Sequence, residues 1–193
     1  MEIIYHHFES LSSTNDWAKD YLAVLEHNAL LLVTADGQTA ARGQFGRTWL
    51  SPKGENLYAS FAFFASSQHE PLTFTHLLAL SAAAVLNDMR ISCRLKWPND
   101  LLVNHKKIAG ILCETVPMTH LGVILGIGLN VNMTSNTLKA ISQPATSLFC
   151  ETGQTYCLDK VCNSLKDKFR EDLTLFLEQG FRPFQETFNH LLL

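Results

Sequence analysis

Two arginines and several glycines lie close together in a segment that has no apolar periodicity. Residues 38–49 read QTAARGQFGRTW, with Arg42 and Arg47 five positions apart. Glycine lets a backbone approach a ligand closely, and the planar fork of arginine pairs with carboxylates and phosphates. The segment has neither the G-x-x-x-x-G-K-[ST] pattern of a P-loop nor a dinucleotide fingerprint. It predicts a loop that grips anions, and the alternative is a solvated loop with surface arginines.

A second charged group begins at residues 96–100, which read KWPND. The proline predicts the end of a strand, and a short hairpin through residues 104–105 would bring Lys107 near Asp100. Taken alone, this pattern favours a surface ion pair, which contributes little to stability. Lys107, however, precedes an apolar strand that contains Gly110. This placement predicts a cation at the mouth of a pocket, with backbone free to approach a ligand.

Two glycines and an asparagine follow in a third apolar stretch. Residues 126–132 read GIGLNVN, with Asn130 after Gly126 and Gly128. A carboxamide can donate and accept at the same time, which suits the edge of an adenine ring. A glycine bulge with a turn-forming asparagine accounts for the pattern equally well.

The elements that must position these groups are strands and helices in mixed order. Strands are expected at 2–8, 29–34, 56–65, 95–103, 107–116 and 121–131, and helices at 17–25, 74–89, 159–178 and 181–190. Capping side chains at 12–15 precede the first helix. Residues 36–54 form a long loop, and loops of this length are often functional. We expect a single domain over residues 1–193 of the α+β (or α/β) class, with a mixed β-sheet covered by helices.

Composition and charge exclude several classes of function. The chain has 47% hydrophobic and 17% charged residues and a net charge of -3, without a basic run, so binding to nucleic acid is not expected. The N-terminus, MEIIYHHFES, does not read as a signal peptide, and the apolar stretch at 77–86 is too short to span a bilayer. Five cysteines without a C-x-x-C pair fit reduced thiols. These features predict a cytoplasmic protein.

Taken together, these segments resemble biotin protein ligases. Their order and spacing match the catalytic domain of that family over nearly the whole chain. Several motifs in register are far more specific than any one of them. The matching segments are STN at 13–15, QTAARGQFGRTWLSPKGENLY at 38–58, KWPNDLL at 96–102, KKIAGIL at 106–112, GIGLNVN at 126–132 and ATSL at 145–148. The resemblance implies a fold like that of class II aminoacyl-tRNA synthetases.

The resemblance also implies a role for each matching residue. The residues implied to bind biotin are Ser13, Thr14, Gln38, Arg42, Lys107, Gly110 and Gly126. Those implied to bind ATP are Arg47, Trp49, Lys107 and Asn130. The catalytic set is Arg42, Arg47, Asp100 and Lys107. Cations belong in such a site because both reactants are anions and negative charge develops at phosphorus.

The implied reaction is an ATP-dependent ligation in two steps. The biotin carboxylate attacks the α-phosphate of ATP and releases pyrophosphate. The amine of an acceptor lysine, on a biotin carboxyl carrier protein, then attacks the mixed anhydride and releases AMP. Mg²⁺ is expected to bind mainly through the ATP phosphates, and Asp100 contacts the metal or orients the amine. Neither nucleic acid nor a membrane is an expected partner, and a homodimer is left open.

The chain departs from the family pattern in two respects. The family loop commonly reads GRGRxGR, whereas this chain has Ala41 and Gln44 at the first glycine and the second arginine. One contact to phosphate or carboxylate is therefore expected to be missing. Many relatives also carry a small C-terminal β-barrel, and some carry an N-terminal DNA-binding domain. We expect neither domain here, and no role as a repressor.

Two other functions remain as alternatives. A lipoate or octanoate ligase or transferase has a related fold, but the RRxxGGGxxxHD segment of those enzymes is not found in this sequence. A polar pocket built for a ureido ring would reject a ligand that lacks it, because the pocket's own polar groups would stay unpaired. The second alternative is a catalytically impaired biotin-binding protein, which the neutral Gln44 makes conceivable.

Overall fold

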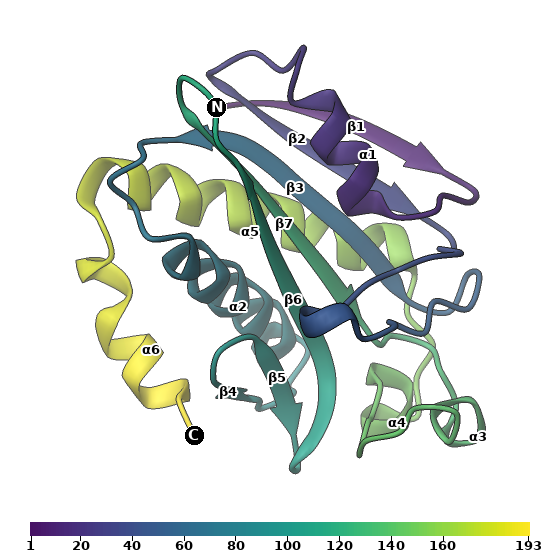
Figure 1. Cartoon of the computed structure of the whole chain (residues 1–193). Helices are drawn as coiled ribbons and strands as arrows, with labels where there is room; N and C mark the ends of the chain where they lie inside the picture. Colours follow the sequence, from purple (N-terminus) through teal and green to yellow (C-terminus); the bar gives the residue numbers. More distant parts are fainter.

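A seven-stranded mixed β-sheet runs through the computed structural model, which describes all 193 residues (Figure 1). The strand order is β1-β2-β3-β7-β6-β5-β4, in which β1 and β2 are parallel and every other pair of neighbours is antiparallel. The strands are β1 (Glu2–Phe8), β2 (Ala29–Ala35), β3 (Leu57–Ala65), β4 (Arg94–Lys96), β5 (Asp100–Val103), β6 (Lys106–Val116) and β7 (Leu121–Leu129). The predicted mixed sheet is confirmed.

Helices cover the two faces of the sheet unequally. The helices are α1 (Thr14–Tyr21), α2 (Pro71–Asp88), α3 (Ser135–Leu138), α4 (Leu148–Thr152), α5 (Leu158–Gln179) and α6 (Gln185–Leu191), with 3-10 turns η1 (Gln44–Gly46) and η2 (Arg182–Phe184). Figure 1 shows α2 and α5 together behind the sheet and α1 in front of it. None of these helices has both the length and the apolar character needed to cross a bilayer.

The main hydrophobic core lies between the sheet and the pair α2 and α5. It contains 36 buried residues, whereas the cluster beneath α1 contains nine. Helix α2 is rich in leucine and alanine and buries most of its side chains, so it can pack closely against both the sheet and α5. The thin cover on the opposite face leaves the centre of the sheet accessible beside α1, and this is where the predicted site residues gather.

Most predicted elements agree with the structure, but the strand expected over residues 95–103 is wrong. The chain forms two short strands there, β4 and β5, which pair antiparallel with Lys96 opposite Asp100. Residues 97–99 make the turn between them, because Pro98 has no N–H to donate to a ladder. The predicted hairpin that follows is confirmed, with Asn104 and His105 at φ values of 49° and 63°.

Two helices have no counterpart in the sequence predictions. Helices α3 and α4 contain only four and five residues, which is too short for an apolar period to develop. Their N-caps, Thr134 and Ser147, each accept a hydrogen bond from a backbone N–H three residues ahead. The predicted helix at 17–25 instead begins at Thr14 and ends at Tyr21, because Ser13 caps it.

Candidate active site

One cavity of about 680 Å³ is lined by the N-terminus of α1, the long loop after β2, and residues of β6 and β7. The cavity brings together every residue that the sequence analysis singled out for chemistry. These lining residues are Ser13, Thr14, Gln38, Arg42, Arg47, Trp49, Asp100, Lys107, Gly110, Gly126 and Asn130. They come from five separate segments of the chain, so only the fold makes them neighbours.

The N-terminus of α1 forms a buried polar chamber at one end of the cavity. Ser13 caps the helix by accepting a hydrogen bond from the backbone N–H of Asp16. The backbone N–H of Thr14 donates to Oε1 of Gln38 at 2.8 Å, and the Thr14 hydroxyl lies 3.1 Å from the same oxygen. Ser60 on β3 lies beneath them, fully buried, with its Oγ 2.8 Å from Oγ1 of Thr14. The chamber therefore presents several polar atoms to a polar ring.

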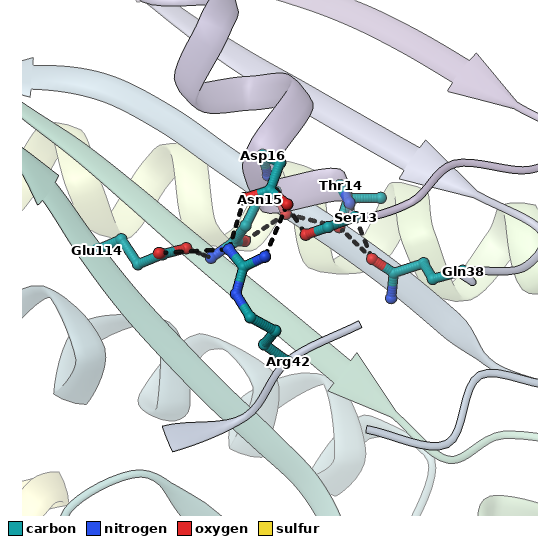
Figure 2. A network of polar contacts seen from close by, with 8 residues as sticks. Ser13, Thr14, Asn15, Asp16, Gln38, Arg42 and Glu114 are labelled. Atoms are coloured by element: carbon teal, nitrogen blue, oxygen red, sulfur yellow. Dashed lines mark hydrogen bonds and ion pairs between the residues drawn. The ribbon is translucent and has the colours of Figure 1, made fainter. Parts of the chain in front are cut away.

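Arg42 does not point freely at the cavity in this structure. Its guanidinium forms a two-pronged ion pair with Asp16, in which Nη1 lies 2.7 Å from Oδ2, and Nη2 lies 3.5 Å from Oε1 of Glu114 (Figure 2). The hydrogen bond from Arg42 lowers the pKa of Asp16, and the same contact raises the pKa of Arg42. Two carboxylates thus offset one guanidinium. In this arrangement Arg42 holds the loop against α1.

The centre of the cavity contains a lysine under an indole ring. Lys107 Nζ lies 2.6 Å from Oδ1 of Asp100 and 5.1 Å from the centre of a Trp49 ring. Gly110 and Gly128 are cross-strand partners on β6 and β7 beneath these groups. A Cβ on Gly110 would lie 2.8 Å from Cε of Lys107, and a Cβ on Gly128 would overlap the indole. Both glycines are therefore needed for Trp49 and Lys107 to lie on the sheet.

Asn130 lies at the far end of the same row. Every second residue of a strand faces the same side, so residues 126, 128 and 130 lie in a row on one face of β7 and its continuation. At about 3.3 Å per residue, this row is about 13 Å long. Asn130 is buried, and its Nδ2 donates to the carbonyl of Thr146 at 2.9 Å. Its carboxamide oxygen accepts no hydrogen bond from the protein. A polar edge is thus available at this end.

The tip of the long loop, next to the cavity-lining residues Gln44 and Arg47, is exposed to solvent. Phe45 is 91% exposed and adopts a positive φ of 58°, and Arg47 lies 6.0 Å from its ring centre. The backbone N–H of Gly43 donates to the Arg47 carbonyl at 2.6 Å and closes the tip, and the backbone N–H of Trp49 donates to the Ala41 carbonyl at 3.0 Å. Unlike Arg42 and Lys107, Arg47 has no carboxylate partner.

Comparison with known proteins identifies the family. Residues 7–132, which contain all the motifs up to GIGLNVN, match the model of the "Biotin/lipoate A/B protein ligase family". The chain belongs to this family. The resemblance to the catalytic domain of biotin protein ligases is therefore confirmed, and so is the predicted fold class.

Individual members of the biotin/lipoate protein ligase family agree with this assignment. The bifunctional ligase/repressor BirA of Bacillus subtilis is 34% identical over 95% of this chain. Biotin protein ligase from Aquifex aeolicus, solved with biotin and ATP, is 31% identical and superposes with a TM-score of 0.82 over 100% of this chain and 78% of its own. The Leishmania major enzyme, solved with biotinyl-5-AMP, is 26% identical, with a TM-score of 0.77 over 97% and 81% of the two chains.

The match does not extend over whole curated relatives. The chain covers 57% of the Bacillus subtilis protein and 55% of the Salmonella typhimurium one, so it spans about half the length of the curated relatives that it matches.

Several polar residues of the site were not predicted from the sequence. Asn15 belongs to the STN motif but no role was predicted for it, and no motif marks Asp16, Ser60 or Glu114. Strand alternation offers one signal, since residues 110, 112 and 114 share a face of β6. The segment 140–145, which also lines the cavity, carries no motif beyond its junction with ATSL.

Proposed function

We propose that this chain is the catalytic unit of an ATP-dependent biotin protein ligase that acts in the cytoplasm. It activates biotin with ATP to biotinyl-5'-AMP and transfers the biotin to a lysine of a biotin carboxyl carrier protein. The observation that carries this proposal is the order of groups within one cavity. A polar chamber, a cation under an indole ring and a buried carboxamide follow one another along β7.

That order parallels the order of groups in biotinyl-adenylate. The ureido ring fits the chamber of Thr14 and Gln38, where neutral donors and acceptors are available. The junction between the biotin carboxylate and the α-phosphate then lies over Lys107, and the adenine reaches Asn130. The spacing of about 13 Å from residue 126 to residue 130 leaves room for such an extended ligand.

Lys107 and Arg47 are the cations that we assign to the first step. Lys107 is largely buried, with 15% of its side chain exposed, so its charge is screened less than that of a surface lysine. Arg47 is exposed at the tip of the loop and lines the cavity, so we assign it to the ATP phosphates. Both cations would offset the charge that develops as the carboxylate attacks phosphorus and pyrophosphate leaves.

Asp100 is the one acidic residue among those that line the cavity, so we assign it both to metal binding and to the second step of the reaction. One carboxylate together with phosphate oxygens is a donor set that Mg²⁺ commonly takes. Asp100 would hold the metal together with the ATP phosphates. After adenylation, we assign the same carboxylate to accept a hydrogen bond from the acceptor lysine amine, a role supported by its position beside Lys107. The amine attacks the anhydride carbonyl, and AMP leaves.

Pyrophosphate exchange with biotin, lipoate and octanoate, measured side by side, tests the proposal. Biotin should drive exchange, because lipoate and octanoate would leave the polar chamber unpaired. Transfer to a biotin carboxyl carrier domain should follow when that domain is added. Exchange with lipoate but not biotin would reassign the substrate. Biotin binding without any exchange would instead identify a catalytically impaired binding protein.

A further inference from the structure

The carboxylate of Glu114 contacts the polar chamber, although it has no part in the proposed reaction. It lies on β6, with 28% of its side chain exposed, and its Oε2 accepts a hydrogen bond of 2.8 Å from Nδ2 of Asn15 (Figure 2). The carboxamide oxygen of Asn15 in turn lies 2.6 Å from Oγ of Ser60. Ser60 Oγ is also 2.8 Å from Oγ1 of Thr14. Glu114 is thus one end of a chain of polar contacts that reaches the ligand-facing threonine.

The carboxylate at this end dictates the direction of every hydrogen bond in the chain. A carboxylate can only accept, so the amino group of Asn15 must face Glu114 and its oxygen must face Ser60. The Ser60 hydroxyl has a single proton, and it must donate that proton to the Asn15 oxygen. No proton from Ser60 is then left for Thr14. The Thr14 proton serves Ser60 Oγ or Gln38 Oε1, at 2.8 and 3.1 Å, and Oγ1 keeps its acceptor capacity.

The packing around Asn15 leaves its amide little freedom to move. Asn15 is 5% exposed, and a Cβ on Gly126 would overlap its carboxamide. The amide is therefore held between the floor of β7, Ser60 and Glu114. A flip that exchanges its nitrogen and oxygen keeps the same shape, so hydrogen bonding alone selects between the two orientations.

We propose that Glu114 is a positioning residue that sets the ligand specificity of the chamber. Through Asn15 and Ser60 it keeps Thr14 Oγ1 available as an acceptor for a ring N–H of the ligand. This role rests on the proposed function, since the ureido ring of biotin supplies two such N–H donors. An acceptor that the network supplies before binding selects cyclic ureas over rings that lack the N–H.

The variant Glu114→Gln tests the role with almost no change of shape. The glutamine introduced there can donate to Asn15 and allow its amide to flip. Ser60 then donates its proton to Thr14 Oγ1, which takes one of the two lone pairs of that oxygen. The Thr14 proton no longer serves Ser60 and is free to point at the ligand, where it opposes a ring N–H. The probes are biotin and two analogues in which one or the other ring N–H is replaced by oxygen, with Kd measured by calorimetry. Wild type should bind one analogue about three- to tenfold more weakly than biotin, the effect of one lost hydrogen bond.

In Glu114→Gln, biotin itself should bind about three- to tenfold more weakly, and the penalty for that analogue should shrink to less than about twofold. The matched control is Asp16→Asn, which also removes a carboxylate partner of Arg42 but lies outside the chain of contacts. Asp16→Asn should change the Kd of biotin and of the analogue by the same factor. A change in the analogue penalty with Asp16→Asn would assign the effect to Arg42 and overturn the proposal.

Ser60→Ala provides a second test that does not depend on Glu114→Gln alone. Without the Ser60 hydroxyl, the orientation of the Asn15 amide can no longer affect Thr14. The double variant Ser60→Ala/Glu114→Gln should therefore show the same ratio of analogue Kd to biotin Kd as the single variant Ser60→Ala. Thermal melting of each variant identifies any loss of fold. A full analogue penalty in folded Glu114→Gln would overturn the role of Glu114. Failure of wild type to bind biotin at all would overturn the proposed function, and this role with it.

Discussion

Lys107 Nζ lies 2.6 Å from Oδ1 of Asp100, so the central cation of the cavity is paired before any ligand binds. The two residues come from adjacent strands, β6 and β5, joined by a tight hairpin. An anionic reactant must therefore share Lys107 with Asp100. Removal of Lys107 should therefore weaken the first step more than removal of Asp100 does.

Lys107→Ala should weaken biotin-dependent pyrophosphate exchange, with a loss of about 1.5–3 kcal/mol in transition-state stabilisation from a charge-assisted contact. Asp100→Asn keeps the lysine charge, so exchange should fall less than in Lys107→Ala, while transfer to the acceptor lysine slows. Steady-state exchange and single-turnover transfer assays separate the two steps. Near wild-type exchange by Lys107→Ala at saturating substrates would place Lys107 outside the chemistry.

The Trp49 ring depends on the bare backbone of Gly128. Gly128→Ala should displace the indole, because the added Cβ overlaps it, and the KM for ATP should rise by more than the KM for biotin. Tryptophan fluorescence reports the displaced ring. Gly122→Ala on the same strand is the control, since its Cβ would meet Leu22 under α1, 2.8 Å away, and not the cavity. That variant should lower stability and leave the ratio of the two KM values unchanged.

Residues 39–48 should be mobile without ligand and become ordered when biotin or biotinyl-adenylate binds. The segment has little apolar content, and its tip is exposed at Phe45. The pair between Arg42 and Asp16 already holds its first part against α1, so the change should be concentrated in residues 43–48. Limited proteolysis with and without ligand measures it. Equal protection in both states would contradict the prediction.

Gln44 should make this chain release its adenylate more readily than relatives with arginine at that position. A neutral amide forms a weaker hydrogen bond to an anion than a guanidinium does. Gln44→Arg should therefore slow the dissociation of biotinyl-adenylate, measured by chasing a labelled adenylate with excess unlabelled biotin and ATP. Gln143→Arg, also on the cavity wall, controls for added positive charge. An unchanged rate in Gln44→Arg would show that position 44 does not set retention.

Acid should destabilise the fold through His76 on α2. Its Nε2 is buried without a hydrogen-bond partner, its ring centre lies 4.6 Å from that of Phe188, and burial lowers its pKa. The unfolded chain therefore binds this proton first, at a pKa of about 6.5. The folded state keeps its full stability above that pH and loses it as the pH falls through the lowered pKa.

Urea unfolding at pH 7.5 and 5.5 measures this effect. The free energy of unfolding of His76→Leu should fall less between the two pH values than that of wild type. The exposed His190 serves as the control, and His190→Gln should retain the wild-type difference. An equal fall in wild type and His76→Leu would assign the pH dependence to other groups.

The sequence by itself determined the family, the fold class and a large part of the residues that line the cavity. Apolar runs marked most strands, and Gly110, Gly126 and Asn130 occupy motif positions that the structure brings into one cavity. These features are local or nearly so, since a strand period and a motif depend on residues close together in the chain. Short helices such as α3 were not predicted, because they have too few residues to show an apolar period.

Only the tertiary structure decided which charges meet. Nothing near residue 42 in the sequence indicates that Asp16 and Glu114, 26 and 72 positions away, share its guanidinium. Nor does any pattern indicate that Asn15 faces Glu114 across the sheet, 99 positions away. Such pairs depend on the register of β6 against β7 and on the placement of α1, which arise from packing of the whole core. Long-range polar contacts have no sequence period, so they become visible only when the chain is folded.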